Sequence, residues 1–534
     1  MNVYFTGFMA TGKSRVGSRV AELLEVPFED TDRYIEARHR KTIPEIFAER
    51  GEAAFRELEI QALEELSAEG PRVISLGGGT LLHPKALPIL RRSGILIGLR
   101  AAPEVISDRV SRKENRPLLA GLDPAERLNK IRLMLAERAP YYAQADFLVE
   151  SSEAVTREEL ADRIVAMLEP WRSKALTVEL GGSRSYPIFA GTNIARFLPS
   201  LLEHKGLGRP VVVADATVAK AQAQVLDEWR QAIPGLPVFL VPSGEVHKTW
   251  GQAGEILGWL LEQGLDRSSC LVAFGGGVVG DMAGFAAACY QRGIDFVQVP
   301  TTLLAMVDSS VGGKTAVDHP LGKNMLGAFH QPRLVLADME ILQTLPEREY
   351  LSGIAEVVKY GVILDESFFR WLENNAAALL RRDPWAVAHA VRESCRIKAE
   401  VVARDEHEHG DRALLNYGHT FGHVLESLTH YTGLLHGEAV ALGMRAAGRL
   451  ATLRGLWSAD QEIRQNALFA SFGLPAAFSP IPREQAWALM AHDKKAKAGR
   501  VRFVLPVGIG HGKVVSDVIQ DDVDRAWLAL EDTL

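Results

Sequence analysis

The chain has 534 residues, of which 47% are hydrophobic and 24% are charged, and its net charge is −7. This length predicts three or four compact units, and the mild acidity argues against nucleic acid or an acidic membrane as the main partner. Cys270, Cys289 and Cys395 lie far apart and form no CxxC pair, which indicates a reducing compartment and argues against a cysteine-ligated zinc. No signal-peptide pattern opens the chain, so we expect a cytoplasmic protein.

The N-terminal residues predict a phosphate-binding loop. Residues 2–6 have the pattern of a short buried strand, and Gly7, Gly12, Lys13 and Ser14 follow with P-loop spacing before a helical run. In such a loop, glycines let backbone N–H groups face phosphate oxygens, the lysine neutralises phosphate charge and the serine hydroxyl binds Mg²⁺. Because strand, loop and helix occur in the required order, we expect a nucleotide with Mg²⁺ here.

Five further motifs narrow the choice of acceptor. They are DTD at 30–32, FRE at 55–57, LGGGT at 76–80, ENRPLL at 114–119 and ERAPYY at 137–142. In this order they resemble shikimate kinase, over about residues 1–168. The resemblance implies ATP as the nucleotide, Asp30 as a water-mediated Mg²⁺ ligand and Arg116 as part of a lid over the phosphates. It assigns shikimate to Asp32, Arg56, Gly78, Gly79 and Arg138.

The chemistry of these residues agrees with the resemblance. Arginines suit a substrate carboxylate, and Asp32 suits the role of orienting the attacking hydroxyl or accepting its proton, with Lys13 as the other catalytic group. The loop has Ala10 and Thr11 before Gly12, where many relatives have a further glycine, but its key positions are intact. A kinase for another small hydroxy acid and a non-catalytic nucleotide sensor stay open as alternatives.

A second region begins after a boundary at roughly 170–175. Strands and helices then alternate to about residue 340, with buried strands predicted at 209–215 and 236–242.

A glycine motif in this region predicts dinucleotide binding. Gly275, Gly277 and Gly280 form GxGxxG after a strand and before a helix, which is the context that the motif requires. Asp215 ends an earlier strand, where its carboxylate can accept from a ribose hydroxyl. A tight packing turn between strand and helix is the alternative interpretation.

Residues 299–332 carry Asp308, Lys314, Lys323 and Asn324 among glycines and small residues. Two lysines and an asparagine in this setting favour a phosphorylated substrate.

Residues 405–438 contain His419, His423, His430 and His436. A spacing of four places His419 and His423 on one face of a helix, which is typical of a site for a divalent transition metal. A solvated helix that is rich in histidine is the alternative.

The block at 299–332 and the later runs SGIAEVVKYG, RALLNYGHTFGH, LHGEAVALGM and HDKKAKAG resemble 3-dehydroquinate synthase, over about residues 175–530. The resemblance implies an enzyme that binds NAD⁺ and one Zn²⁺, with Co²⁺ possible. Its reaction converts 3-deoxy-D-arabino-heptulosonate 7-phosphate to 3-dehydroquinate and phosphate, and NAD⁺ ends unchanged. Another sugar-phosphate cyclase or a metal-dependent polyol dehydrogenase stays open, although the lysine-rich phosphate grip argues against the dehydrogenase.

The resemblance distributes roles over individual residues. The metal ligands are matched by Glu356, His419 and His436, so only one of the two histidines paired by spacing is kept. Catalytic and substrate positions are matched by Asp308, Lys314, Lys359, Lys398, Arg412, Asn416 and His423. Phosphate and substrate contacts are matched by Lys323, Asn324 and one of Lys494 or Lys495, and Arg292 matches a residue that enters the neighbouring subunit's site. The NAD⁺ surroundings are matched by Asp215, Glu245, Lys248, Gly277, Val278, Val279, Gly280, Asp281, Thr301, Thr302 and Thr344, together with Lys314 and Lys323.

We therefore expect an α/β protein in three parts. Residues 1–170 form a P-loop kinase with a parallel sheet, 176–340 a Rossmann-like NAD-binding half, and 341–534 a mostly helical metal-binding half. The second site lies between the last two parts, where ligand pockets often form. The expected partners are small-molecule substrates and a second copy of the chain, bound through the synthase part as a homodimer.

Overall fold

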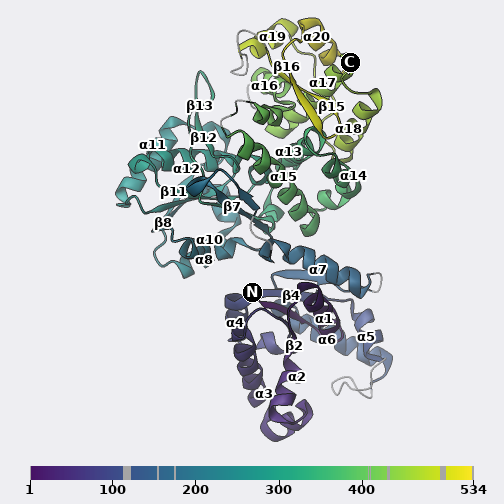
Figure 1. Cartoon of the computed structure of the whole chain (residues 1–534). Helices are drawn as coiled ribbons and strands as arrows, with labels where there is room; N and C mark the ends of the chain where they lie inside the picture. The colour runs from purple at the N-terminus through teal and green to yellow at the C-terminus, as the bar shows by residue number, and fades with distance from the viewer. Residues whose placement is uncertain are drawn as a thin grey trace. The chain divides into compact units, whose positions relative to one another are not determined.

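The computed structural model describes residues 2–111, 122–152, 155–172, 176–406, 408, 410–429, 433–492 and 501–531. The chain divides into two compact units, Met1–Glu169 and Pro170–Leu534 (Figure 1). Within the described ranges, no helix combines the length and the apolar character needed to cross a membrane. Four residues named above lie outside the described residues: Arg116, His430, Lys494 and Lys495.

The first unit contains a five-stranded parallel sheet in the order β2-β3-β1-β4-β5. Its strands are β1 (Asn2–Gly7), β2 (Phe28–Asp30), β3 (Val73–Ser75), β4 (Gly94–Arg100) and β5 (Phe147–Glu150). Every residue of β1 is buried, because this strand is central and has a neighbour on each side. The expected buried strand at 2–6 and the parallel kinase sheet are thus confirmed.

Helices connect these strands. They are α1 (Lys13–Leu24), α2 (Thr31–His39), α3 (Ile43–Ala68), α4 (Ala86–Ser93), α5 (Pro103–Ser111), α6 (Pro124–Tyr142) and α7 (Arg157–Arg172). Gly12 caps α1 with φ 100°, a left-handed conformation that favours glycine. Asp30 ends β2 and caps α2 by accepting from the backbone N–H of Arg33. The loops that follow the carboxyl ends of β1 and β2 therefore carry the predicted nucleotide and Mg²⁺ residues.

The second unit contains a seven-stranded sheet in the order β6-β7-β14-β11-β10-β8-β9, in which β6 is antiparallel and the other pairs are parallel. Its strands are β6 (Leu176–Val178), β7 (Tyr186–Gly191), β8 (Pro210–Asp215), β9 (Val238–Val241), β10 (Cys270–Gly275), β11 (Asp295–Pro300) and β14 (Leu334–Asp338). Alternate residues of β8 pack into two different hydrophobic cores. Val211 and Val213 lie in one core, and Val212 and Ala214 lie in the other. The sheet is therefore covered on both faces, as parallel sheets require.

The strand predicted at 236–242 is not fully buried. It forms β9 at the edge of the sheet, with a single neighbouring strand, and Leu240 is 53% exposed. An apolar run indicates a strand but does not reveal its place in the sheet.

Helices and two hairpins complete the second unit. The helices before residue 300 are α8 (Leu198–His204), α9 (Ala216–Ala221), α10 (Ala223–Ala232), α11 (Trp250–Glu262) and α12 (Gly277–Cys289). The later helices are α13 (Glu347–Ile363), α14 (Glu366–Leu380), α15 (Pro384–Arg404), α16 (His419–Leu428), α17 (His436–Leu453), α18 (Ala459–Ser471), α19 (Arg483–His492) and α20 (Gln520–Leu528). The hairpins are β12 (Lys314–His319) with β13 (Gly322–Phe329), and β15 (Phe503–Gly508) with β16 (His511–Val515). The last third of the chain is thus mostly helical, as predicted, with one added hairpin.

A short π-helix, η7 (Ala305–Ser309), follows β11 and packs against α13 and α15. π-Helical turns are rare and often occur at functional sites. Because η7 carries Asp308, it joins the sheet to the helices that hold the other predicted catalytic residues.

Candidate active sites

The P-loop lies between β1 and α1. A Cβ on Gly7 would lie 2.3 Å from the carbonyl oxygen of Leu99, and the φ of Gly7 is 137°, so this position requires glycine. The Lys13 ammonium donates to the carbonyl oxygens of Gly7 (2.8 Å) and Phe8 (3.1 Å), so the lysine lies back over the loop. Ser14 Oγ donates to Asp30 Oδ2 at 2.7 Å, which brings together the two predicted Mg²⁺ groups.

A glycine turn after β3 gathers the predicted shikimate residues. A Cβ on Gly77 would lie 3.0 Å from Asp32 Oδ1, and one on Gly79 would lie 2.6 Å from Arg56 Nη1. Arg138 Nη1 donates to the carbonyl oxygen of Gly78 at 3.3 Å. Three charged side chains from α2, α3 and α6 therefore converge on one turn.

Burial raises the pKa of Asp32 to about 6, and the nearby carboxylates of Asp30 and Glu59 act in the same direction. The pKa remains below neutral pH, so the carboxylate is mostly ionised and can accept a hydrogen bond from a hydroxyl at pH 7.

Two residues at this turn were not predicted. Glu59 is 1% exposed and accepts from Arg56 Nη1 at 2.6 Å and from Thr80 Oγ1 at 2.7 Å. The Tyr142 hydroxyl donates to the carbonyl oxygen of Gly78 at 2.7 Å. The signal for Glu59 is its position three residues after Arg56 on a helix, and Tyr142 belongs to the ERAPYY motif.

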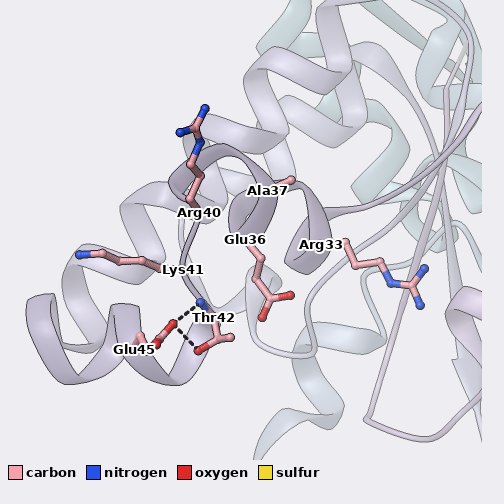
Figure 2. Close-up of a pocket in the computed structure, with 7 residues that line it drawn as sticks. All are labelled: Arg33, Glu36, Ala37, Arg40, Lys41, Thr42 and Glu45. Atoms are coloured by element: carbon pink, nitrogen blue, oxygen red, sulfur yellow. Dashed lines mark hydrogen bonds between the residues drawn. The ribbon is translucent and has the colours of Figure 1, made fainter.

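A surface groove between α2 and α3 is a separate feature of the first unit (Figure 2). Lys41 pairs there with Glu49, and the Glu45 carboxylate accepts from the backbone and hydroxyl of Thr42 as a helix cap. These exposed contacts stabilise the start of α3. None of the predicted nucleotide or shikimate residues is among the described residues that line the groove.

In the second unit, the GxGxxG segment is a close-packed strand-to-helix turn. A Cβ on Gly275 would lie 2.7 Å from Val279 Cβ, and one on Gly280 would lie 2.7 Å from Gln298 Oε1. The turn leads into α12, whose first residues include Gly277 and Val278. The N-terminus of a helix after such a turn favours anions.

Lys248 joins this turn to the β12–β13 hairpin. Lys248 is 4% exposed, and its ammonium donates to Asp281 Oδ2 and to Asn324 Oδ1, both at 2.6 Å. Lys323 pairs with Glu245 at 3.2 Å. The structure thus brings together predicted cofactor residues and predicted substrate residues from three separate segments.

The remaining predicted cofactor residues are more dispersed. Asp215 caps α9 by accepting from the backbone N–H groups of Thr217 (2.8 Å) and Val218 (3.1 Å). Thr344 accepts from Gln222 Nε2 at 2.7 Å. Thr302 Oγ1 caps the turn before η7, and Thr301 Oγ1 is buried without a hydrogen bond. Asp215 therefore stabilises the start of α9, in addition to any contact with a ribose.

Glu356, His419 and His436 form a group that can hold a metal ion, with one ligand atom of each within 4.8 Å of the others. Glu356 comes from the middle of α13, and the histidines are the first residues of α16 and α17. Glu356 Oε1 lies 3.7 Å from Nε2 of each histidine, is fully buried and makes no hydrogen bond to the residues that the structure describes. A buried carboxylate oxygen without a hydrogen bond is costly, so this donor set fits a divalent cation.

His423 is not a member of this group. Its ring centroid lies 5.6 Å from that of His419, in an edge-on arrangement. The helix places the two rings on one face, as the spacing predicts, but α13 and α17 supply the other donors.

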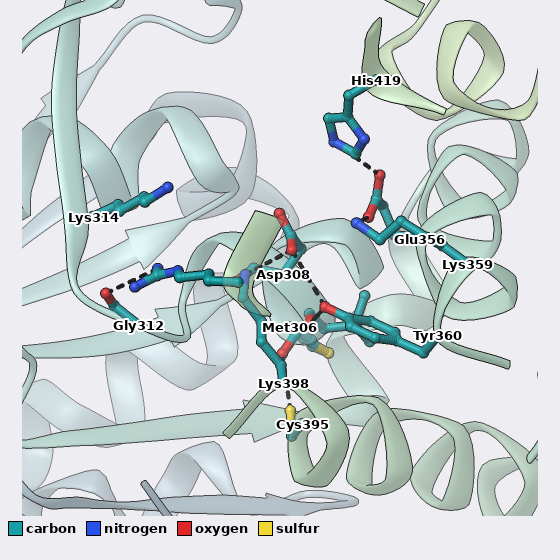
Figure 3. A network of polar contacts seen from close by, with 12 residues as sticks. Met306, Asp308, Gly312, Lys314, Glu356, Lys359, Tyr360, Cys395, Lys398 and His419 are labelled. Carbon is teal, nitrogen blue, oxygen red and sulfur yellow. Dashed lines mark hydrogen bonds and ion pairs between the residues drawn. The ribbon is translucent and has the colours of Figure 1, made fainter. Parts of the chain in front are cut away.

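A buried polar network surrounds Asp308 (Figure 3). Lys398 Nζ donates to the backbone oxygen and to Oδ1 of Asp308, both at 2.6 Å. The Tyr360 hydroxyl lies 2.8 Å from the carbonyl oxygen of Val307 and 3.3 Å from Asp308 Oδ1. Burial alone would raise the pKa of Asp308, but the ammonium groups of Lys398 and Lys359 outweigh it and lower the pKa. Asp308 is therefore an anion.

Lys359 is 1% exposed and donates to Glu356 Oε2, one turn earlier on the same helix. The second oxygen of Glu356 is thus left for another partner. Cys395 Sγ donates to the carbonyl oxygen of Met306 at 3.3 Å. Side chains of α13 and α15 therefore fix η7 as well as the metal group.

Three further predicted substrate residues, Lys314, Arg412 and Asn416, contact the segment that contains Glu406 and Glu408. Glu408, which was not predicted, accepts from Lys314 and from Asn416 Nδ2 (2.6 Å). Arg412 donates to the carbonyl oxygens of Glu406 and Gly312. A carboxylate of the chain itself thus contacts the groups expected to bind an anion.

Arg292 is exposed and has φ 68°, an unusual backbone conformation for a residue with a side chain. It follows α12 in a short turn.

Comparisons with known proteins match both units of the chain to known families. Residues 9–169 match the shikimate kinase family, residues 238–352 the N-terminal part of 3-dehydroquinate synthase and residues 353–496 its C-terminal part. The chain is 52% identical over 359 residues to 3-dehydroquinate synthase from Halorhodospira halophila. The aligned region covers 67% of this chain and 98% of that protein. It is 50% identical over 351 residues to the synthase from Acidithiobacillus ferrooxidans, covering 65% and 95%.

A solved structure is also similar to the second unit. It is the 2-epi-5-epi-valiolone synthase ValA from Streptomyces hygroscopicus subsp. jinggangensis, with NAD⁺ and Zn²⁺ bound. The identity is 30% and the TM-score is 0.60, over 65% of this chain and 96% of that one.

Proposed function

This chain belongs to the 3-dehydroquinate synthase family and carries a shikimate kinase domain before it, and we propose how its own residues perform the two activities. It is a shikimate-pathway enzyme that phosphorylates shikimate and forms 3-dehydroquinate. The single observation that carries the proposal for the synthase is the buried Glu356 Oε1, which lies between two imidazoles without a hydrogen bond to any described residue.

In the kinase, Lys13 and Ser14 bind the phosphates of ATP and the Mg²⁺ ion, with Asp30 as a further Mg²⁺ group. Arg56 and Arg138 hold the shikimate carboxylate, because arginines at a glycine turn can approach a planar anion closely. The ionised Asp32 orients the attacking hydroxyl and accepts its proton. The closeness of these side chains to residues 77–79 supports this assignment.

In the synthase, residues 176–340 form the NAD-binding half and residues 341–534 the metal-binding half. Glu356, His419 and His436 hold Zn²⁺ or Co²⁺. The bound metal supplies Lewis-acid stabilisation of oxygen anions, and NAD⁺ supplies a reversible hydride transfer. Lys359 neutralises the remaining charge of Glu356, and its hydrogen bond keeps one carboxylate oxygen directed away from the imidazoles.

The substrate anions need cationic partners. Asp308, held by Lys398, orients a substrate hydroxyl, while Lys314, Arg412, Asn416 and His423 bind the carboxylate and phosphate. Lys314 and Asn416 already contact a carboxylate, that of Glu408, which supports an anion-binding role. Lys323 and Asn324 complete the phosphate-binding residues, next to the GxGxxG turn.

We also propose a homodimer through the synthase part, in which Arg292 reaches the neighbouring site. Its exposure and the exposed apolar residues Met325 and Phe329 on β13 support this proposal. Sedimentation should give twice the monomer mass, and Arg292→Ala should slow the synthase without dissociating the dimer. A fully active monomer would contradict the proposal.

Two variants test the division of labour. Lys13→Ala should lower shikimate-dependent ADP formation at least about 100-fold, because a preorganised cation at the phosphates is lost. His419→Ala should lower phosphate release from the heptulosonate substrate by a similar factor and leave the kinase rate unchanged. If either change abolished both activities, the two sites would not be independent.

A further inference from the structure

The two imidazoles of the metal group are held by different partners. Nδ1 of His419 lies 3.1 Å from the backbone oxygen of Tyr417, whereas Nδ1 of His436 lies 3.2 Å from the Glu426 carboxylate. Both contacts leave Nε2 facing Glu356 Oε1. A backbone carbonyl and a carboxylate can each fix the Nδ1–H tautomer, but only the carboxylate adds a negative charge.

The local fold places Glu426 beside His436. His419, His423 and Glu426 occupy positions i, i+4 and i+7 of α16, which lie on one face of the helix. α16 packs along α17, whose first residue is His436, and the His419 ring lies 5.3 Å from the His436 ring between centroids. Glu426 is 6% exposed, and a carboxylate this deeply buried is stable only with a charged or strongly polar partner. The imidazole of His436 is that partner.

His419 and His436 both begin a helix, but only His436 has a carboxylate at Nδ1. The N-terminus of a helix carries a partial positive charge, which makes an imidazole there less basic and therefore a weaker metal ligand. A carboxylate that accepts the Nδ1 proton offsets this effect and raises the basicity of Nε2.

We propose that Glu426 is a positioning residue for the metal: it fixes the tautomer of His436 and strengthens this histidine as a ligand. The inference rests on the proposed metal site and goes beyond it, because Glu426 itself contributes no ligand atom to the group.

Metal affinity tests the inference directly. The full chain is freed of metal with a chelator, and Zn²⁺ binding is measured by competition with a chromophoric chelator. Glu426→Gln keeps the shape of the side chain but removes its charge, and should raise the dissociation constant for Zn²⁺ about 10- to 100-fold. The visible absorption of the Co²⁺-loaded variant should shift, because the bond to His436 changes. The kinase rate and the circular dichroism spectrum should stay unchanged.

Glu438→Gln is the matched control. Glu438 lies in the same helical turn as His436, but its carboxylate is directed to other groups, accepting from Leu435 N (2.8 Å) and Arg348 Nε (2.7 Å). Its loss loosens the start of α17 and should leave Zn²⁺ affinity within about threefold of wild type, since surface pairs contribute little. Equal weakening by both glutamate variants would overturn the inference, because the effect would then come from the position of α17.

His436→Ala separates failure of the inference from failure of the metal site. If His436→Ala loses Zn²⁺ while Glu426→Gln binds it like wild type, the role of Glu426 is overturned and the metal site stands. If His436→Ala keeps wild-type affinity, the metal site itself is wrong, and the inference fails with it.

Discussion

The two units assemble their sites in different ways. In the first unit, most of the predicted groups follow the ends of β1, β2 and β3, which are neighbours in a parallel sheet, and Arg56 and Arg138 reach them from α3 and α6. In the second, the metal group comes from the middle of α13 and the first residues of α16 and α17, and Asp308 comes from a π-helix. Parallel strand ends meet at one edge of a sheet by construction, whereas helix ends meet only where packing brings them.

The sites also differ in how deeply their cations are buried. The Arg56 side chain is 21% exposed in the kinase, although its partner Glu59 is 2% exposed, while the Lys359 side chain in the synthase is 1% exposed and its partner Glu356 is 0% exposed. Charges near water cost little when they lose a partner, and buried charges cost much. Changes in the synthase site should therefore alter stability together with activity, and changes in the kinase site mainly activity.

The largest effect is expected for Lys398→Met. This change leaves the Asp308 carboxylate, whose side chain is 26% exposed, without its main partner, which should destabilise the synthase unit by about 2 kcal/mol and abolish phosphate release. Scanning calorimetry should show a lower transition temperature for this unit and an unchanged one for the kinase unit.

Lys314→Met is the control for that change. The Lys314 side chain is 50% exposed in its pair with Glu408, so its loss should cost less than about 1 kcal/mol while still impairing the synthase. Equal stability losses for the two lysine variants would break the contrast between buried and exposed charges.

A smaller effect is expected for Tyr360→Phe. The hydroxyl ties η7 and Asp308 to the helix that carries Glu356, and its removal should lower the kcat of the synthase about tenfold, as misplaced catalytic groups do. The KM and the metal content should change little. Tyr350→Phe on the same helix removes a buried hydrogen bond to Leu379 (2.8 Å) and should lower stability by about 1 kcal/mol without affecting kcat. An unchanged kcat in Tyr360→Phe would show that the Tyr360 hydroxyl is not needed to position η7.

An effect of similar size, but limited to substrate affinity, is expected in the kinase for Glu59→Gln. The variant weakens a charge-assisted hydrogen bond to Arg56, worth about 1.5 kcal/mol, so the KM for shikimate should rise about tenfold. The KM for ATP should not change. Glu52→Gln affects the same arginine from an exposed position and should stay within twofold of wild type. A rise in both KM values would mean that Glu59 supports the whole unit and not the shikimate side alone.

The sequence by itself determined the order of elements and most of the residue types at the two sites. The P-loop and GxGxxG segments are local: each requires a strand, a glycine turn and a helix in succession, and β1–α1 and β10–α12 follow that order. Glycine is needed at Gly7, because its φ is 137° and a Cβ there would lie 2.3 Å from the backbone oxygen of Leu99. The order of strand, turn and helix is a constraint between residues that are close in the chain, so it can be recognised without a structure.

Tertiary structure decided which of these residues meet. Helical periodicity pairs His419 with His423, and the resemblance to the synthase family names Glu356 and His436, but no spacing in the chain brings three helices to one point. The same holds for the contacts of Lys248 with Asn324 and of Glu426 with His436. These pairs form because apolar faces far apart in the sequence pack together and bury polar groups that must then find partners.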